Sequence, residues 1–234
     1  MKKYIKKIVP SQFVSAVRRF LPATSYYPCL ELDWGGVIEL TGPPGVGKSF
    51  LIRELAKLGS QKKLRGNFSS IELNSFRKHL LQEKTNHMPH LEEKELQRLR
   101  RDQLFCQDAG NEALLLDEHL TQHQSREIVS ALQNEVDGYE EFLAKRLVVI
   151  LEDDPEVIME KVRHRHENQN HIWDGHRNKS KQEIMDISQR VMESRQKMHD
   201  IIRQKGGNSL RLDALSGLEA MIQQIVEYLE TRSA

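Results

Sequence analysis

The sequence predicts an α/β fold with a parallel sheet of five strands flanked by helices. Two observations lead to this fold class. Short runs of branched and apolar residues alternate along the chain with segments of helical periodicity, an order typical of parallel sheets. The chain has 234 residues, 38% of them hydrophobic and 29% charged, which is long enough for one sizeable core and short for two. We therefore expect one domain with added ends.

The N-terminal 34 residues are predicted to form a basic amphipathic arm, and residues 35–234 the folded domain. The first 21 residues carry six lysines or arginines and no acid, interleaved with apolar residues. One interpretation is peripheral contact with an anionic membrane surface or a protein partner; the other, which we favour, is an extension packed on its own domain. Pro22 and Pro28 bracket a stretch that is predicted to be rich in turns.

Five strands and five helical regions are predicted. Residues 37–41, Ala113–Asp117 and 146–151 are strongly apolar, as expected of central strands. A weaker strand is expected around residues 70–73, and a last strand at residues 209–213. The helical regions are expected at residues 50–58, 74–108, 155–166, 180–205 and 217–231.

A glycine-rich motif between the first strand and the first helix matches the pattern GxxxxGK[ST] at every fixed position. Glycines allow a tight turn and bring backbone N–H groups close to phosphate oxygens, and the helix N-terminus that follows favours an anion. We therefore predict that this loop binds ATP, with Lys48 at the β- and γ-phosphates and the Ser49 hydroxyl on Mg²⁺. The predicted cofactor-binding residues are Gly42, Pro43, Pro44, Gly45, Val46, Gly47, Lys48, Ser49 and Phe50.

Asp117 follows a four-residue apolar run, which predicts that its carboxylate lies at the carboxyl edge of the sheet, where ligands bind in open α/β folds. There it either holds Mg²⁺ or accepts the proton of an attacking hydroxyl, and the adjacent Glu118 is the second choice for the base. A purely structural alternative is that Asp117 caps the next helix. Glu72, at the end of the weak strand, is a lower-ranked rival for the base.

From residue 37 to residue 231 the order of these features resembles the P-loop small-molecule kinases, the group of nucleotide, nucleoside and shikimate-type kinases. The passage at residues 148–165, a strand followed by a helix that ends in arginines, carries this resemblance together with the loop. The resemblance implies a helical lid at about residues 164–180, and a turn at residues 213–216 beside the nucleotide base. One departure is that residues 117–123 contain no acceptor-binding motif of that group.

The same resemblance implies that Arg163 and Arg165 act as catalytic residues that clamp phosphoryl oxygens during transfer. Helical geometry ranks them: at about 100° per residue, Arg165 lies near the face of Ile158 and Val162, and Arg163 lies roughly 140° away. We therefore favour Arg165. The alternative for both residues is solvated charge at the end of a helix.

Two functions follow from these residues. The first is an ATP- and Mg²⁺-dependent phosphotransferase that acts on a hydroxyl or phosphate group of a small-molecule acceptor, with Lys48, Asp117, Glu118, Arg163 and Arg165 as the catalytic set. The second is a P-loop ATPase or nucleotide switch that acts on a protein partner, with Glu118 activating water. Residues 73–108, which are expected to select the acceptor, show no diagnostic pattern.

Charge and cysteine content exclude some partners and compartments. The formal net charge of +1 provides no global field for a polyanion, so no nucleic acid is expected as a partner. Two distant cysteines cannot form a disulfide framework, and no apolar run reaches the roughly 18 residues of a membrane span. We expect a cytoplasmic protein.

Overall fold

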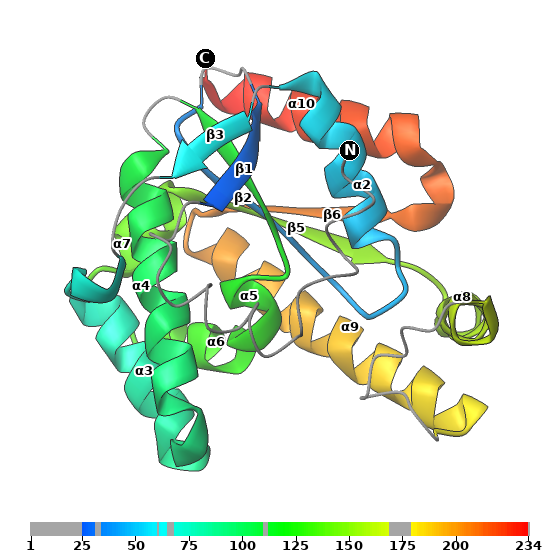
Figure 1. Cartoon of the computed structure of the whole chain (residues 1–234), viewed down its shortest axis with the longest axis horizontal. Helices are drawn as coiled ribbons and strands as arrows, with labels where there is room; N and C mark the ends of the chain where they lie inside the picture. Colours follow the sequence, from blue (N-terminus) through cyan, green and yellow to red (C-terminus); the bar gives the residue numbers. More distant parts are fainter. Residues whose placement is uncertain are drawn as a thin grey trace, which may run out of the picture.

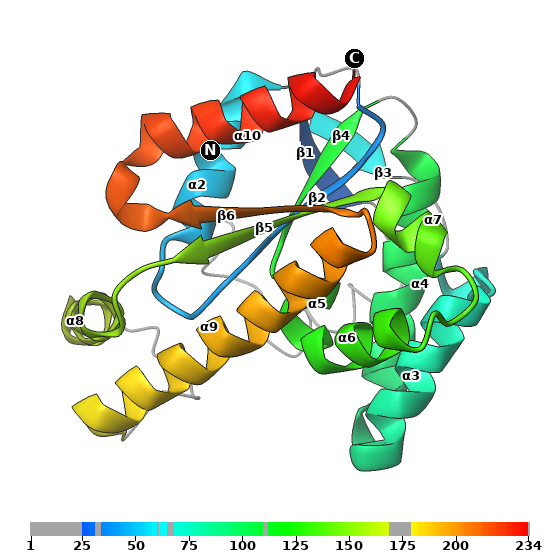
Figure 2. The ribbon, with the colours of Figure 1, turned by 180° about the vertical axis from the view of Figure 1, so that it is seen from behind.

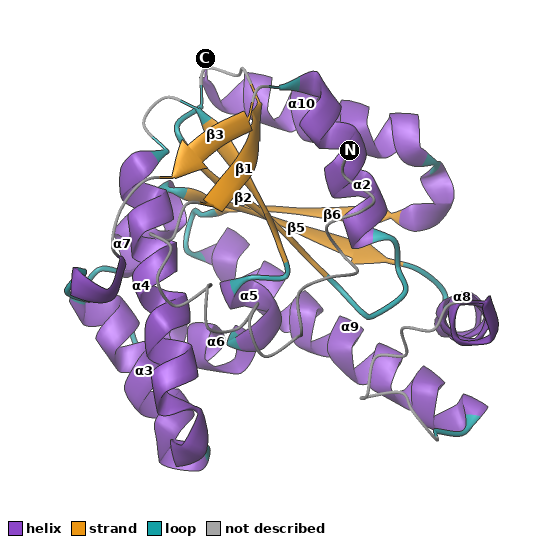
Figure 3. Ribbon diagram, viewed as in Figure 1, coloured by secondary structure: helices purple, strands orange, loops and turns teal. Residues whose placement is uncertain are grey.

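The computed structural model describes residues 25–30, 34–59, 61–64, 68–109, 112–168 and 179–233. Within these ranges a six-stranded sheet has the order β3-β1-β4-β2-β5-β6, and helices cover both of its faces (Figures 1 and 3). The strands are β1 (Ser25–Leu30), β2 (Gly36–Thr41), β3 (Gln61–Leu64), β4 (Ala113–Asp117), β5 (Arg146–Glu152) and β6 (Asn208–Asp213). The predicted α/β class is confirmed. No helix of the described ranges is long and apolar enough to cross a membrane.

The parallel part of the sheet has four strands, β4, β2, β5 and β6, so the prediction of five parallel strands is wrong. Residues 70–73 do not form the expected strand. Side chains of the neighbouring helix α4 (Glu92–Asp108) bind their backbone instead: Gln103 Nε2 donates to Glu72 O (2.8 Å), and Arg100 Nε donates to Ile71 O (3.1 Å). Because these carbonyls are already satisfied, no sheet partner is needed.

The place beside β4 is taken by β1, which runs antiparallel to it with Cys29 opposite Leu114. The expectation of turns between Pro22 and Pro28 is therefore wrong for residues 25–28, which belong to β1. In turn, β3 pairs antiparallel with β1 at the edge of the sheet. Residues 1–24 lie outside the described residues, and the basic arm stays a prediction.

The helices form a layer on each side of the sheet (Figure 2). On one side, α2 (Lys48–Leu55) and α10 (Leu218–Ser233) bury Leu51, Leu55, Ile225 and Leu229 against alternate residues of the strands. The other side is covered by α3 (Ser75–His87), α4, α5 (Leu120–His123), α6 (Ser125–Gln133), α7 (Tyr139–Ala144) and α9 (Lys181–Gln204). Helix α8 (Pro155–Asn168) lies beyond the carboxyl end of β5. Short 3₁₀ helices are η2 (Ala56–Leu58), η3 (Phe68–Ser70), η4 (Pro89–Leu91) and η6 (Ala214–Ser216).

Strand β5 shows why the sequence forms a central strand. Its odd-numbered residues, such as Leu147 and Val149, pack in the core with α2 and α10, whereas Val148 and Ile150 pack in the core with α3, α6 and α9. Successive side chains of a strand point to opposite faces, so a continuous apolar run is what burial on both faces requires.

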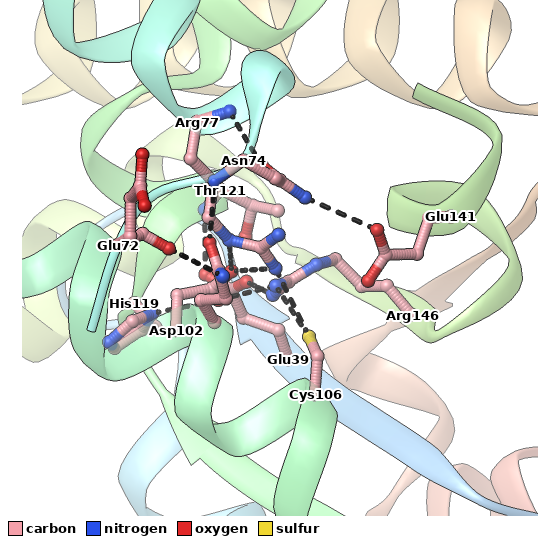
Figure 4. A network of polar contacts seen from close by, with 11 residues as sticks. Glu39, Glu72, Asn74, Arg77, Asp102, Cys106, His119, Thr121, Glu141 and Arg146 are labelled. Carbon is pink, nitrogen blue, oxygen red and sulfur yellow. Dashed lines mark hydrogen bonds and ion pairs between the residues drawn. The ribbon is translucent and has the colours of Figure 1, made fainter. Parts of the chain in front are cut away.

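Four buried charged side chains attach the α3–α4 pair to the sheet, and Figure 4 shows them pointing toward one another. Arg77 of α3 donates from Nε (3.0 Å) and Nη2 (2.7 Å) to Asp102 Oδ2 of α4. Arg146 of β5 donates to the other oxygen of Asp102 and to Glu39 of β2. Burial alone raises the pKa of Asp102, but Arg146 and Arg77 lower it well below its usual range. Asp102 is therefore ionised at neutral pH.

Candidate functional site

The glycine-rich loop joins the carboxyl end of β2 to the N-terminus of α2, as the motif requires. Gly45 has a φ of +90°, and a Cβ atom there would lie 2.8 Å from Cγ2 of Val162 in α8. Glycine is needed at this position both for its backbone conformation and for the close approach of α8. Val46 is 2% exposed and packs in the core, which anchors the loop. The loop and α8 are thus in direct contact.

Lys48 is buried and folded back onto the loop. Its Nζ atom donates to Gly42 O (2.9 Å) and Pro43 O (2.8 Å) and forms an ion pair with Glu118 Oε1 (3.0 Å). Burial lowers the pKa of Lys48, and Glu118 opposes this shift. An ammonium group held by carbonyl oxygens and one carboxylate can exchange these partners for phosphate oxygens.

Ser49 and Asp117 meet across the gap between α2 and β4. Ser49 Oγ donates to Asp117 Oδ2 at 2.8 Å, because β4 lies beside β2 and ends level with it, with Asp117 opposite Leu40. Surrounding protein atoms raise the pKa of Asp117, although its carboxylate stays partly open to solvent. A hydroxyl and a carboxylate oxygen in contact fit Mg²⁺, which prefers oxygen ligands and keeps several of its waters.

Glu118 adopts a left-handed backbone conformation that residues other than glycine rarely adopt. Its φ is +50°, and its N–H donates to Leu40 O at 3.3 Å. The side chain is 46% exposed and points toward Lys48. Non-glycine residues in this region cost free energy and are concentrated at functional sites. The Glu118 carboxylate lies 3.0 Å from Lys48 Nζ, beside the loop.

Phe50, Arg163 and Arg165 are more exposed than the buried Val46 and Lys48 of the loop. The Phe50 ring is 50% exposed, and the Arg53 guanidinium lies 5.7 Å from its centroid. Arg163 forms an ion pair with Glu167 at 3.9 Å, and Arg165 is exposed. Helix α8 contacts the loop through its buried face, so both arginines stand on a helix beside the site. The rest of the predicted lid, residues 169–178, lies outside the described residues.

Sequence reasoning missed two residues, Gln122 and Arg195, that the structure brings to the start of the loop. Gln122 Oε1 accepts hydrogen bonds from Thr41 Oγ1 (2.8 Å) and from Gly42 N (3.2 Å). Arg195 of α9 donates from Nε to Thr41 Oγ1 and from Nη2 to Gln122 O, both at 2.8 Å. One signal was available: Arg195 lies on the same helical face as Ser188 and Met198, both fully buried, where an arginine is unusual.

Glu72, the weaker choice for the base, lies away from this site. Its side chain is 87% exposed and forms an ion pair with Lys78 at 3.0 Å. The backbone of residues 71 and 72 is hydrogen-bonded to side chains of α4 instead of to a strand. Glu72 therefore does not lie at the carboxyl edge of the sheet.

A family model described as an AAA domain matches residues 38–186, which is more than half of the chain. The chain belongs to this family. The matched part of this AAA domain includes the phosphate-binding loop, Asp117, Glu118 and α8, and the predicted resemblance to P-loop small-molecule kinases is confirmed at the level of a kinase-like NTPase. A search of curated proteins found no match.

Among solved structures, this AAA domain is similar to shikimate kinase from Bacteroides thetaiotaomicron, at 15% sequence identity and a TM-score of 0.44. The alignment covers 83% of this chain and 98% of the shikimate kinase chain.

Proposed function

We propose that this AAA domain is an ATP- and Mg²⁺-dependent phosphotransferase that acts on a hydroxyl or phosphate group of a small-molecule acceptor. The observation that carries the proposal is the meeting of three groups at the carboxyl edge of the sheet. These are the Lys48 ammonium, the Ser49–Asp117 pair and the strained Glu118. Together they supply the cation, the metal ligands and the base that phosphoryl transfer needs.

Nucleotide binding changes the partners of Lys48. The β- and γ-phosphates of ATP accept hydrogen bonds from the N–H groups of the loop. The Lys48 ammonium exchanges the carbonyl oxygens of Gly42 and Pro43 for phosphate oxygens. Ser49 and Asp117, which contact each other in this structure, are the residues that would hold Mg²⁺. The metal, when bound, neutralises charge on the phosphates.

The chemical step is an in-line transfer. The acceptor oxygen forms a bond to the γ-phosphorus while the bond from that phosphorus to the bridging oxygen of ADP breaks. For a hydroxyl acceptor, the proton passes to Asp117 or Glu118. Arg163 and Arg165, on the helix that touches Gly45, stabilise the transferred group once the lid closes.

The nucleotide base is proposed to lie near residues 213–216. A cavity of about 700 Å³ at the carboxyl ends of β5 and β6 is lined by Leu215, which is 67% exposed, and by several carboxylates, including Asp213. An apolar side chain provides a contact for the base, and carboxylates accept hydrogen bonds from an amino group. We also propose a reducing, cytoplasmic compartment, because two cysteines far apart in the sequence cannot form a disulfide framework.

The second candidate is an ATPase or nucleotide switch that acts on a protein partner. The half-exposed Glu118 carboxylate favours it, because a base open to solvent can activate water. The arginine-bearing helix beside the loop favours transfer.

A transfer assay with γ-labelled ATP and Mg²⁺ distinguishes the two. Nucleosides, nucleoside monophosphates, sugars and acidic metabolites serve as acceptors, and Lys48→Ala is the inactive variant. Lys57→Ala is the matched control, because Lys57 is exposed and pairs with Glu54 in the turn that follows α2. Label on one acceptor class that is absent in Lys48→Ala supports the kinase. Label found only as free phosphate supports the ATPase, and transfer that persists in Lys48→Ala refutes the assignment.

A further inference from the structure

A cavity of about 320 Å³ lies between α6 and α9. Its lining contains two arginines, two serines and two apolar residues, and no acid: Ser125, Ile187, Arg190, Val191, Ser194 and Arg195. Positive charge and hydroxyl donors without a carboxylate are suited to an anion. The apolar residues offer a surface for a carbon skeleton.

Arg195 is the deepest member of this lining. Its side chain is 4% exposed, and its hydrogen bonds in the described residues go to neutral oxygens: Thr41 Oγ1, Gln122 O and, at 3.4 Å, Ser194 Oγ. Burial lowers the pKa of Arg195 to about 10, and Glu39 and Glu118 oppose this shift. A buried cation without a direct carboxylate partner is costly, and an anionic ligand in the cavity removes that cost.

The other polar groups of the lining are Ser125, Ser194 and Arg190. Ser125 Oγ, at the first residue of α6, lies 3.1 Å from Ser194 Oγ of α9. Arg190 is exposed at the rim, one helical turn before Ser194, and its Nε donates to Asp186 O at 3.2 Å. Helix α9 thus supplies both guanidinium groups and one hydroxyl of the lining, and α6, which packs against it, supplies the other hydroxyl.

We propose that this cavity binds an anionic group, a phosphate or a carboxylate, of the phosphoryl acceptor. The proposal rests on the proposed transferase function and specifies its substrate class. Arg195 contacts Thr41, the residue immediately before the loop, so an anion beside it is held next to the site of transfer. Arg190 and Arg195 recognise the charge, and Ile187 and Val191 contact the adjoining carbon atoms.

Calorimetric titration of the intact chain tests the cavity directly. The protein is saturated with ADP and Mg²⁺ so that the loop is filled, and is then titrated with inorganic phosphate, with succinate as a carboxylate and with glycerol as a neutral control. We expect one saturable site for an anion and none for glycerol. Arg190→Gln should weaken that site by about tenfold or more, the loss of one charge-assisted hydrogen bond. Arg203→Gln, exposed further along α9, should leave it unchanged.

The two anions identify the group that is recognised: a response to phosphate alone indicates a phosphorylated acceptor, and a response to succinate indicates a carboxylate. No anion binding to the ADP-loaded protein, or equal binding in Arg190→Gln and Arg203→Gln, overturns the proposal. Thermal unfolding of both variants shows that they remain folded, which is expected because both arginines are exposed.

Failure of the transferase function is distinguishable from failure of the cavity. If ATP and ADP do not bind, the titration is repeated with nucleotide-free Lys48→Ala protein, in which the loop lysine cannot hold phosphate. If transfer is observed, Arg190→Gln should raise the KM of the acceptor with the KM of ATP unchanged. An equal rise in both constants assigns Arg190 to the nucleotide and refutes the acceptor subsite.

Discussion

Replacing Asp102 with Asn should strongly destabilise the fold. The carboxylate is fully buried and accepts two hydrogen bonds from Arg77 and one from Arg146, with Glu39 as the second acid of the network. The negative charges of two carboxylates balance the positive charges of two guanidinium groups. The Asn variant therefore leaves one buried positive charge without a negative partner. Breaking a buried pair costs about 3–5 kcal/mol. For a domain of this size that lowers Tm by about 6–20 °C.

Urea denaturation followed by circular dichroism measures the effect. Glu72→Gln is the matched control, because it removes a carboxylate from an ion pair with Lys78 that is largely exposed, where the expected change is about 0–1 kcal/mol. An Asp102→Asn protein within about 1 kcal/mol of wild type would show that the network does not hold α3 and α4 to the sheet.

The same variant has a pH signature. The pKa of Asp102 in the folded chain lies below its value in the unfolded chain, so its contribution is fully present above the unfolded pKa of about 4. It is lost as pH falls from there toward the folded pKa. Because Asn does not titrate, the difference in unfolding free energy between wild type and variant should narrow below about pH 4.

Three further outcomes are expected. Ser49→Ala should weaken Mg²⁺-dependent ATP binding by about tenfold and leave Mg²⁺-free binding nearly unchanged, as measured by calorimetry; equal loss in both conditions contradicts a metal role. Glu118→Gln removes the ion pair with Lys48, and kcat should fall about 10²–10⁴-fold if Glu118 is the base. If instead kcat is retained and ATP binds more tightly, Glu118 only competes with the phosphates of ATP for Lys48. Burial lowers the pKa of His123 to about 4, so stability should decline as pH falls from about 6.5 to about 4; an unchanged profile in His123→Gln would contradict this.

The phosphate-binding loop and its neighbours could be predicted because their determinants are local. The turn needs glycines at fixed spacing, and the adjoining strands are apolar on both faces. The pairing of Ser49 with Asp117 follows from placing both at the carboxyl edge of adjacent parallel strands. Their roles in binding and catalysis stay predictions.

The edge of the sheet could not be predicted, because strand pairing is decided between distant segments. The sequence of residues 70–73 is typical of a short strand, but Gln103 and Arg100 of α4 donate hydrogen bonds to backbone carbonyls of this segment. Residues 25–30, interrupted by Pro28, instead take the free side of β4. Neither outcome is encoded within the segment concerned.

By itself, the sequence determined the α/β class, the glycine-rich loop between β2 and α2 and the acidic residue at the end of β4, because each depends on residues close together in the chain. Only the tertiary structure decided which distant side chains complete the site. Arg195 lies 154 positions from Thr41 and reaches it because α9 packs across the sheet. Long-range packing determines which polar groups are buried together, and short-range patterns do not record it.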